Sequence, residues 1–206
     1  SWGIVSNLAR KAPPSPNEFD SSGRDTLHHF GTLIQTDVRL TLGASGGPLL
    51  DRQGRMIGLC VALAATTGHE MAAGYAIPVD ATFHRVLATL KEGREVEYGF
   101  LGVRPTNLPP REIHAGRHGT RLTEVVPGTP ADRFGLREGD ILTAVNGKPI
   151  HEADGLYLEV GKLPVEAVAH LTILRDGRPR QIDVQLSKYP VRGRKVVTAP
   201  RPAWRG

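Results

Sequence analysis

Cysteine is almost absent from this sequence, since Cys60 is the only one among 206 residues. A single cysteine excludes an internal disulfide framework. Cys60 lies in the apolar run 56–63, where a small buried side chain is the expected role. Long apolar runs are also missing, because no stretch approaches the roughly 18–20 residues that a membrane-spanning helix needs. We therefore expect no membrane span.

An initial methionine is missing too. The chain opens on Ser1, directly into strand-like sequence. We expect the natural N-terminus to lie upstream, so the absence of a signal peptide does not indicate a compartment.

Acidic residues are missing from the end of the chain. Between Lys188 and Gly206 there are six basic residues and no acidic ones. Subtracting these six from the net charge of +5 leaves −1 for the rest, so the folded part is close to neutral. Residues 189–206 are basic and contain prolines, and we predict a disordered tail. An acidic surface or RNA is a possible contact for this tail, but a solvated end is favoured and no nucleic-acid partner is predicted.

Glycine and proline, by contrast, are plentiful. The 24 glycines and 16 prolines favour many turns and short strands over long helices, so the fold class is predicted to be mainly β. Residues 11–26 are predicted to form a long loop. The expected strands are 33–38, 55–64, 71–77, 100–104, 121–126, 140–145, 168–174 and 181–186. Turns are expected at 146–147 and 175–178.

Helical periodicity is clear once, from Val79 to Leu90, where apolar residues recur at helical spacing. Asp80 is a suitable N-cap, and Gly93 follows as a stop signal. Shorter helices are expected at 130–134 and 151–160. The polar segment 93–98 is the predicted linker between a first domain, 1–92, and a second domain, 99–188.

The segment 43–48 places Ser45 among glycines, between two expected strands. Flanking glycines allow a tight turn that exposes a hydroxyl and lets successive N–H groups converge on a developing oxyanion. A tight turn with an idle serine is the alternative, and this short loop alone favours it.

An ordered set of further motifs accompanies this loop, at 33–37, 48–51, 54–58 and 74–78. Together these segments resemble the HtrA/DegP family of trypsin-like serine proteases, and the resemblance extends over residues 2–188. It implies that Ser45 is the nucleophile and that the N–H groups of Gly43 and Ser45 form the oxyanion hole. It also implies roles in substrate binding. The implied substrate-binding residues are Arg39, near the floor of the pocket for the residue before the cleaved bond, and Ala73, Gly74 and Tyr75, on an edge strand that pairs with substrate.

The sequence departs from the family pattern at Thr41, Leu42 and Ala44, and Arg39 stands where the family has a small residue. A serine also needs a base oriented by an acid. In the family both come from a first β-barrel, and the 44 residues before Ser45 are too few to form one. The chain is therefore expected to be a fragment, inactive by itself, that holds the C-terminal half of the protease domain. His28 and His29 are weak candidates for a substitute base, and the spacing of His114 and His118 is a weak candidate for a metal site because Pro110 and Gly116 favour a loop.

The second domain opens with Phe100, Leu101, Gly102 and Val103 and continues with ordered motifs at 126–131, 135–136, 139–142 and 145–150. This set resembles a PDZ domain, in which an extended peptide adds to a strand and its terminal carboxylate meets backbone N–H groups. The N–H groups would be those around Leu101 and Gly102. The implied apolar pocket is lined by Phe100, Val103, Leu156 and Val160. Leu101 could equally be a core residue.

The resemblance implies a serine endopeptidase with a PDZ domain for protein quality control in the periplasm or cell envelope. Its partners would be unfolded or C-terminal peptide substrates, it needs no cofactor or metal, and the intact protein could assemble as trimers. The alternative is a non-catalytic PDZ scaffold protein with a degenerate protease half.

Overall fold

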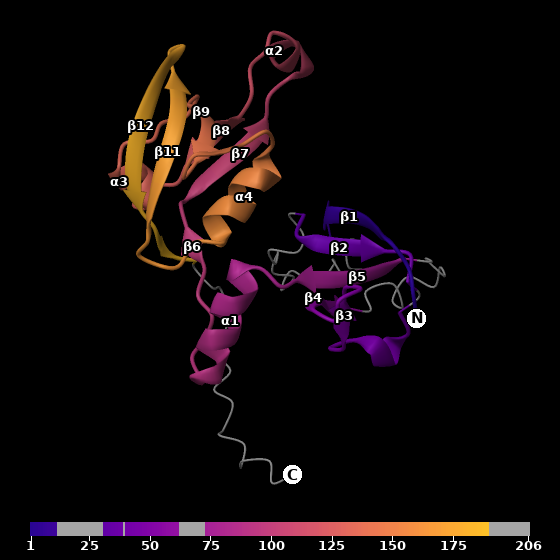
Figure 1. Ribbon diagram of the computed structural model, residues 1–206. Coiled ribbons are helices and arrows are strands. Elements are labelled where there is room, and N and C mark those ends of the chain that lie inside the picture. The colour runs from indigo at the N-terminus through magenta and orange to yellow at the C-terminus, as the bar shows by residue number, and fades with distance from the viewer. Residues whose placement is uncertain (12–30, 39, 62–72, 190–206) are drawn as a thin grey trace.

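The computed structural model describes residues 1–11, 31–38, 40–61 and 73–189. In this part the chain is mainly β, as predicted, with two larger sheets, one two-stranded sheet and few helices (Figure 1). Arg39, the predicted long loop from residue 12 to 26, and residues 190–206 of the predicted tail lie outside the described residues.

The first sheet has five antiparallel strands in the order β1-β2-β5-β4-β3. These strands are β1 (Val5–Arg10), β2 (Leu33–Thr36), β3 (Pro48–Leu50), β4 (Met56–Val61) and β5 (Gly74–Pro78). Its buried apolar residues among those described are few: Leu33, Ile34, Cys60, Tyr75 and Ala76. The burial of Cys60 confirms the prediction for it.

One strand of this sheet is shorter than expected. The predicted strand 33–38 ends at Thr36, because the Asp37 carboxylate accepts a hydrogen bond from the Ile4 N–H at 2.7 Å and turns the chain. Residues 62–64 and 71–72 of two other predicted strands lie outside the described residues.

Helix α1 (Ala81–Lys91) follows β5 and begins and ends as predicted. The Asp80 carboxylate accepts a hydrogen bond from the Phe83 N–H at 2.9 Å, and Gly93 follows the last turn. No residue of α1 is fully buried, so its apolar stripe is only partly covered.

The second sheet has the strand order β12-β11-β9-β8-β7, with β10 paired to β9. The strands are β7 (Val103–Asn107), β8 (Thr120–Val125), β9 (Ile141–Val145), β10 (Lys148–Pro149), β11 (Val168–Arg175) and β12 (Arg178–Gln185). The turns at 146–147 and 175–178 form where predicted, each with two residues between its strands, and Asp176 and Gly177 are at the centre of the second.

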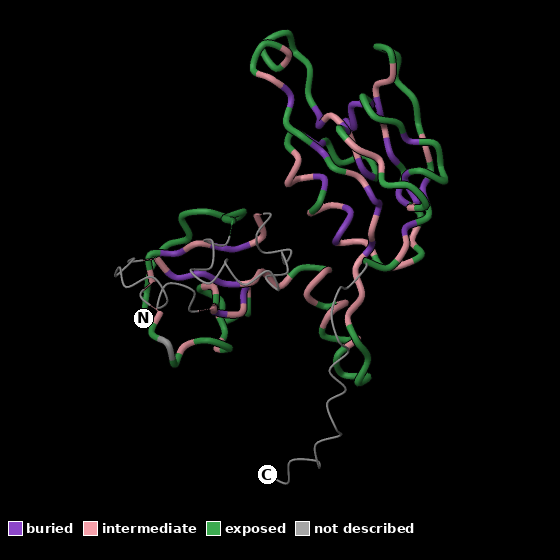
Figure 2. The backbone as a smooth tube through the Cα atoms, turned by 180° about the vertical axis from the view of Figure 1, so that it is seen from behind, coloured by how far each residue is buried: buried purple, intermediate pink, exposed green. Residues whose placement is uncertain are grey.

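Helices and a short strand pair complete this unit. Helix α3 (Pro130–Arg133) and helix α4 (Ala153–Gly161) lie close to the predicted helices, and β6 (Gly99–Phe100) pairs with β13 (Ser187–Lys188). Helix α4 packs against β6 and β7. Figure 2 shows a larger buried core here than in the first sheet. Sixteen buried apolar residues lie between residues 99 and 188, against five in the described part of residues 1–92.

Two predictions for this unit need correction. The expected strand 100–104 is broken after Phe100, because Gly102 has a φ of +89° that a strand does not allow. The segment around Pro110 was expected to be a loop but forms helix α2 (Pro110–His114), since proline is well suited to the first turn of a helix. The helix ends before Gly116, so it does not place His114 and His118 on one face.

Candidate active-site loop and peptide groove

Ser45 stands exposed at the end of a 3₁₀ turn, Leu42–Ala44, on a loop that is tied to its neighbours by backbone hydrogen bonds. The Ala44 N–H donates to the Thr41 carbonyl oxygen at 2.9 Å, and the Gly47 N–H donates to the Ala44 carbonyl oxygen at 3.0 Å. These bonds close two consecutive turns around the serine.

Strand β4 anchors the other side of the loop. The Gly46 N–H donates to the Cys60 carbonyl oxygen at 2.9 Å, and the Cys60 N–H donates to the Gly47 carbonyl oxygen at 2.8 Å. Burial raises the pKa of the Cys60 thiol, so this residue is an uncharged packing group behind the loop. The N–H groups of Ala44, Gly46 and Gly47 are thus committed to the loop's own fold. The predicted oxyanion hole depends on the other two, those of Gly43 and Ser45.

The predicted substrate strand needs a correction. Strand β5 lies in the middle of its sheet, between β2 and β4. Tyr75 is paired with Gln35 on one side and Val61 on the other, and its side chain is only 1% exposed. Tyr75 therefore belongs to the core and is not on an open edge. The sequence could not show this, because the pairing partners of a strand are distant in the chain.

The surroundings of Ala73 and Gly74 differ from those of Tyr75. Ala73 precedes β5 and is partly exposed, while Gly74 is paired with Thr36. A side chain at Gly74 would come within 2.6 Å of the Val38 carbonyl oxygen, so glycine is required there by close packing. Main-chain pairing with a substrate stays a prediction for Ala73 and Gly74 only.

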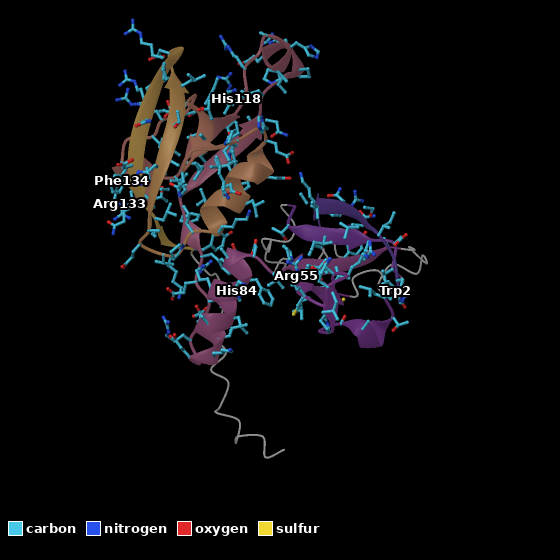
Figure 3. All side chains as sticks on the ribbon, viewed as in Figure 1. Trp2, Arg55, His84, His118, Arg133 and Phe134 are labelled. Atoms are coloured by element: carbon cyan, nitrogen blue, oxygen red, sulfur yellow. The ribbon has the colours of Figure 1, made fainter. Side chains whose placement is uncertain are left out.

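No histidine is present in the described part of residues 1–78. His84 lies on α1, and His118 lies beside the second sheet (Figure 3). No group of three or more histidine, cysteine, aspartate or glutamate side chains among the described residues could hold a metal ion. The described first sheet thus supplies Ser45 with no histidine base.

The second candidate site is the predicted peptide groove along β7, which is the last strand of its sheet and packs against α4. The Leu101 carbonyl oxygen accepts a hydrogen bond from the Ala131 N–H, and the Gly102 carbonyl oxygen accepts one from the Val126 N–H, both at 2.9 Å. In a trans peptide unit the N–H points opposite to the carbonyl, and the described chain has no cis peptide bond. The N–H groups of Gly102 and Val103 therefore point away from α3 and β8, on the side open to a ligand.

Gly102 is fixed in this loop by its surroundings. A Cβ atom at this position would lie 2.2 Å from the Thr129 side chain, and the Thr129 hydroxyl donates to the Gly102 carbonyl oxygen at 3.3 Å. The positive φ and this close contact leave no room for a side chain. The loop is therefore shaped by glycine at the point where the N–H groups align.

Apolar side chains lie behind the groove. Leu101, Leu156 and Val160 are 3%, 1% and 6% exposed and belong to one core cluster, against which the partly buried Val103 packs. Phe100 is partly buried, and its ring meets the edge of the Tyr189 ring at 5.3 Å. The structure thus gives Leu101 a core role. A role in binding peptide stays a prediction for these side chains.

One functional feature of the groove was missed from the sequence. The Asn107 side chain, at the end of β7, accepts a hydrogen bond from the Ala153 N–H at 2.7 Å and so caps the start of α4. Pro105 also lies within β7, one residue beyond the expected strand 100–104, and a proline next to an expected strand was the signal that could have marked this strand as an edge.

Comparison with known proteins agrees with these features. A family model described as PDZ domain matches residues 121–175. The periplasmic serine endoprotease DegP of Escherichia coli K12 is 30% identical over 190 residues, which are 90% of this chain and 37% of that protein. A probable periplasmic serine endoprotease, DegP-like, from Chlamydia trachomatis serovar D is 33% identical over 200 residues, 92% of this chain and 39% of that protein. The chain thus spans well under half the length of these relatives.

Solved structures give the same fold. The HtrA-type protease AlgW, in a structure with a tripeptide, superposes with a TM-score of 0.67 at 24% identity, covering 92% of this chain and 60% of that one. None of the described helices is long and apolar enough to cross a membrane. Over most of its length the chain is thus similar in sequence to DegP-type serine endoproteases, residues 121–175 match a PDZ domain, and the fold is similar to that of an HtrA-type protease.

Proposed function

We propose that the protein carrying this chain is a serine endopeptidase that captures peptide chains through its PDZ groove and cleaves them with Ser45. The observation that carries the proposal is the exposed Ser45 on its tied glycine loop, in a chain related to serine endoproteases over 90% of its length. Gly43 and Ser45 would supply the oxyanion donors. Unfolded proteins in the periplasm or cell envelope are the proposed substrates, since the relatives are named periplasmic.

The reaction needs more than Ser45. A serine hydroxyl becomes a nucleophile when a base takes its proton, and an acid must orient that base. Because the described residues 1–78 include no histidine, a histidine base would have to come from outside this described part. His28 and His29 match no catalytic residue of the resembled family, so we predict that an isolated chain of 206 residues hydrolyses no casein.

A serine-directed fluorophosphonate probe tests this reasoning. The isolated chain should show no labelling, whereas the longer natural protein should be labelled and should lose labelling in Ser45→Ala. If Ser45 of the isolated chain were labelled stoichiometrically, a base within the chain would be active. Labelling of neither form would favour the non-catalytic scaffold, which the departures at Thr41, Leu42 and Ala44 support.

For the PDZ unit, we propose binding of peptides by their C-terminal carboxylate and an apolar last residue. The two aligned N–H groups of Gly102 and Val103 and the edge position of β7 support this mode. Amidating the peptide replaces a charged acceptor by a neutral amide. Charge-assisted hydrogen bonds contribute roughly 1.5–3 kcal/mol, so affinity should fall about tenfold to a hundredfold. Titration of the free-acid and amidated forms by fluorescence anisotropy measures the difference, and equal affinities would contradict the carboxylate site.

A further inference from the structure

The backbone of β7 alternates between its partner strand and the open groove. The Gly102 carbonyl oxygen accepts from the Val126 N–H at 2.9 Å, the Arg104 carbonyl oxygen from the Thr123 hydroxyl at 2.9 Å, and the Thr106 carbonyl oxygen from the Thr120 hydroxyl at 2.8 Å. These alternate residues therefore turn their backbone groups toward β8. Since successive residues of a strand turn theirs to opposite edges, the residues between them face the groove. Those residues are Val103, Pro105 and Asn107.

The partner strand gives independent support for the direction of Pro105. Pro105 stands opposite Leu122 in the register of β7 and β8. Both backbone groups of Leu122 are bonded on its other side, where its N–H donates to the Asp140 carbonyl oxygen and its carbonyl oxygen accepts from the Gly139 N–H, both at 2.8 Å. Leu122 therefore has no backbone group directed at Pro105, and the Pro105 backbone belongs to the open edge.

Proline has a carbonyl oxygen but no N–H. A peptide that lies antiparallel to β7, with its carboxylate at Gly102, pairs every second residue with a groove-facing residue. Its last residue meets Val103, and its third residue from the end meets Pro105. That third residue can donate its N–H to the Pro105 carbonyl oxygen, but its own carbonyl oxygen finds no backbone donor.

The end of β7 that lies farthest from Gly102 is bonded to α4. The Asn107 side chain is bonded to the Ala153 N–H at 2.7 Å, so the end of β7 is tied to the start of α4. Any pairing of the ligand backbone beyond Pro105 would have to form next to this hydrogen bond.

We propose that Pro105 interrupts the main-chain ladder of the groove, so that this PDZ unit recognises mainly the carboxylate and the last two residues of a C-terminal peptide. The inference rests on the proposed carboxylate site and adds what limits the number of ligand residues that pair with β7. Because Pro105 has no backbone N–H, it limits how much of a ligand the strand can pair with. The expected ligands are therefore short, apolar C-terminal peptide ends and not long extended segments.

The test restores the missing donor. In the full 206-residue chain, Pro105→Val supplies an N–H and keeps an apolar side chain at a buried position. The probe is a fluorescein-labelled, alanine-rich hexapeptide ending in valine, with counterparts ending in leucine and phenylalanine. One added net hydrogen bond corresponds to a gain in affinity of about threefold to tenfold. The matched control is Thr106→Val, whose backbone faces β8, and its affinity should stay within twofold of the unmodified chain.

A second arm identifies the bond itself. In a depsipeptide version of the probe, an ester replaces the amide between the third and second residues from the end and weakens the carbonyl acceptor. The ratio of the affinities for the amide and ester probes should be the same in the unmodified chain and in Thr106→Val. In Pro105→Val the gain in affinity should appear with the amide probe and be lost with the ester probe. Thermal midpoints of all three proteins show whether each is folded.

The outcomes separate the two ideas. If the unmodified chain prefers free-acid over amidated probe but Pro105→Val gains nothing while remaining folded, the Pro105 inference is wrong and the carboxylate site stands. A gain that persists with the ester probe also overturns the inference, because another contact would explain it. If Pro105→Val is unfolded, Pro105→Ala repeats the test. Equal affinity for free-acid and amidated probes overturns the carboxylate site and the Pro105 inference together.

Discussion

Asp140 is a carboxylate whose side chain is only 1% exposed, and its charge is balanced by Arg175. The Arg175 Nε donates to Oδ1 and the Nη2 to Oδ2, both at 2.7 Å, and the Arg137 N–H adds a bond of 2.8 Å to Oδ2. The Arg175 Nη2 also donates to the Gly135 carbonyl oxygen at 2.8 Å. The hydrogen bond to Asp140 holds the pKa of the Arg175 guanidinium above its usual range. This pair fastens β11 to the turn before β9.

Arg175→Ala should destabilise the PDZ unit strongly. The substitution removes both charged donors and leaves the buried Asp140 carboxylate with the Arg137 N–H. Removing one partner of a buried ion pair costs about 3–5 kcal/mol, because the remaining charge loses its compensation. In a domain of about 90 residues each kcal/mol lowers the thermal midpoint by roughly 4–8 °C, so a fall of at least about 12 °C is expected.

Hydrogen exchange of the full chain, followed by mass spectrometry, measures this locally. Peptides from β9 and β11 should lose protection by a factor of about a hundred or more, while peptides from β4 should be unchanged. Arg178→Ala, an exposed arginine on the same hairpin, is the matched control and should have little effect. The double variant Asp140→Ala/Arg175→Ala should be more stable than Arg175→Ala, since it removes the buried charge. A loss of less than fivefold in Arg175→Ala would refute the reasoning.

Two further predictions concern the first sheet. A fragment of residues 1–92 should show no cooperative thermal unfolding, whereas residues 99–188 should unfold cooperatively, because the described apolar core lies mostly in the second fragment; circular dichroism of the two fragments checks this. Since burial raises the pKa of the Cys60 thiol, the thiolate is scarce in the folded chain at pH 8 and reaction with Ellman's reagent should be at least about tenfold slower than in urea. Equal rates in the two states would show that the first sheet opens readily.

Features that depend on neighbours in the chain could be predicted well. Asp80 caps α1 and Gly93 ends it, because capping involves residues within one helical turn. The hairpin turn at Asp176 and Gly177 also forms as expected, because it too depends only on neighbouring residues: two residues with positive φ suffice to reverse a strand.

Features that depend on distant partners could not be predicted from the sequence. Tyr75 was expected on an open edge, but strands β2 and β4 occupy both of its sides. Leu101 could line a pocket or fill the core, and its burial against residues far along the chain makes it a core residue. The direction of the Pro105 backbone likewise follows from its register opposite Leu122. Strand pairing decides the cases of Tyr75 and Pro105 and core packing decides that of Leu101, and a sequence pattern gives only one side of either kind of contact.

The two candidate sites differ in what they need to work. The groove is formed by β7, α4 and the loop at Gly102, which pack within one well-filled core, so its chemistry can be tested in this chain. The Ser45 loop belongs to a sheet with few buried apolar residues among those described, and Trp2, Ile4 and Leu8, in or just before its first strand, are 93%, 70% and 73% exposed. The few buried side chains of this sheet give it little apolar stabilisation, so the chemistry of Ser45 has to be tested in a form of the protein in which the sheet is stably folded.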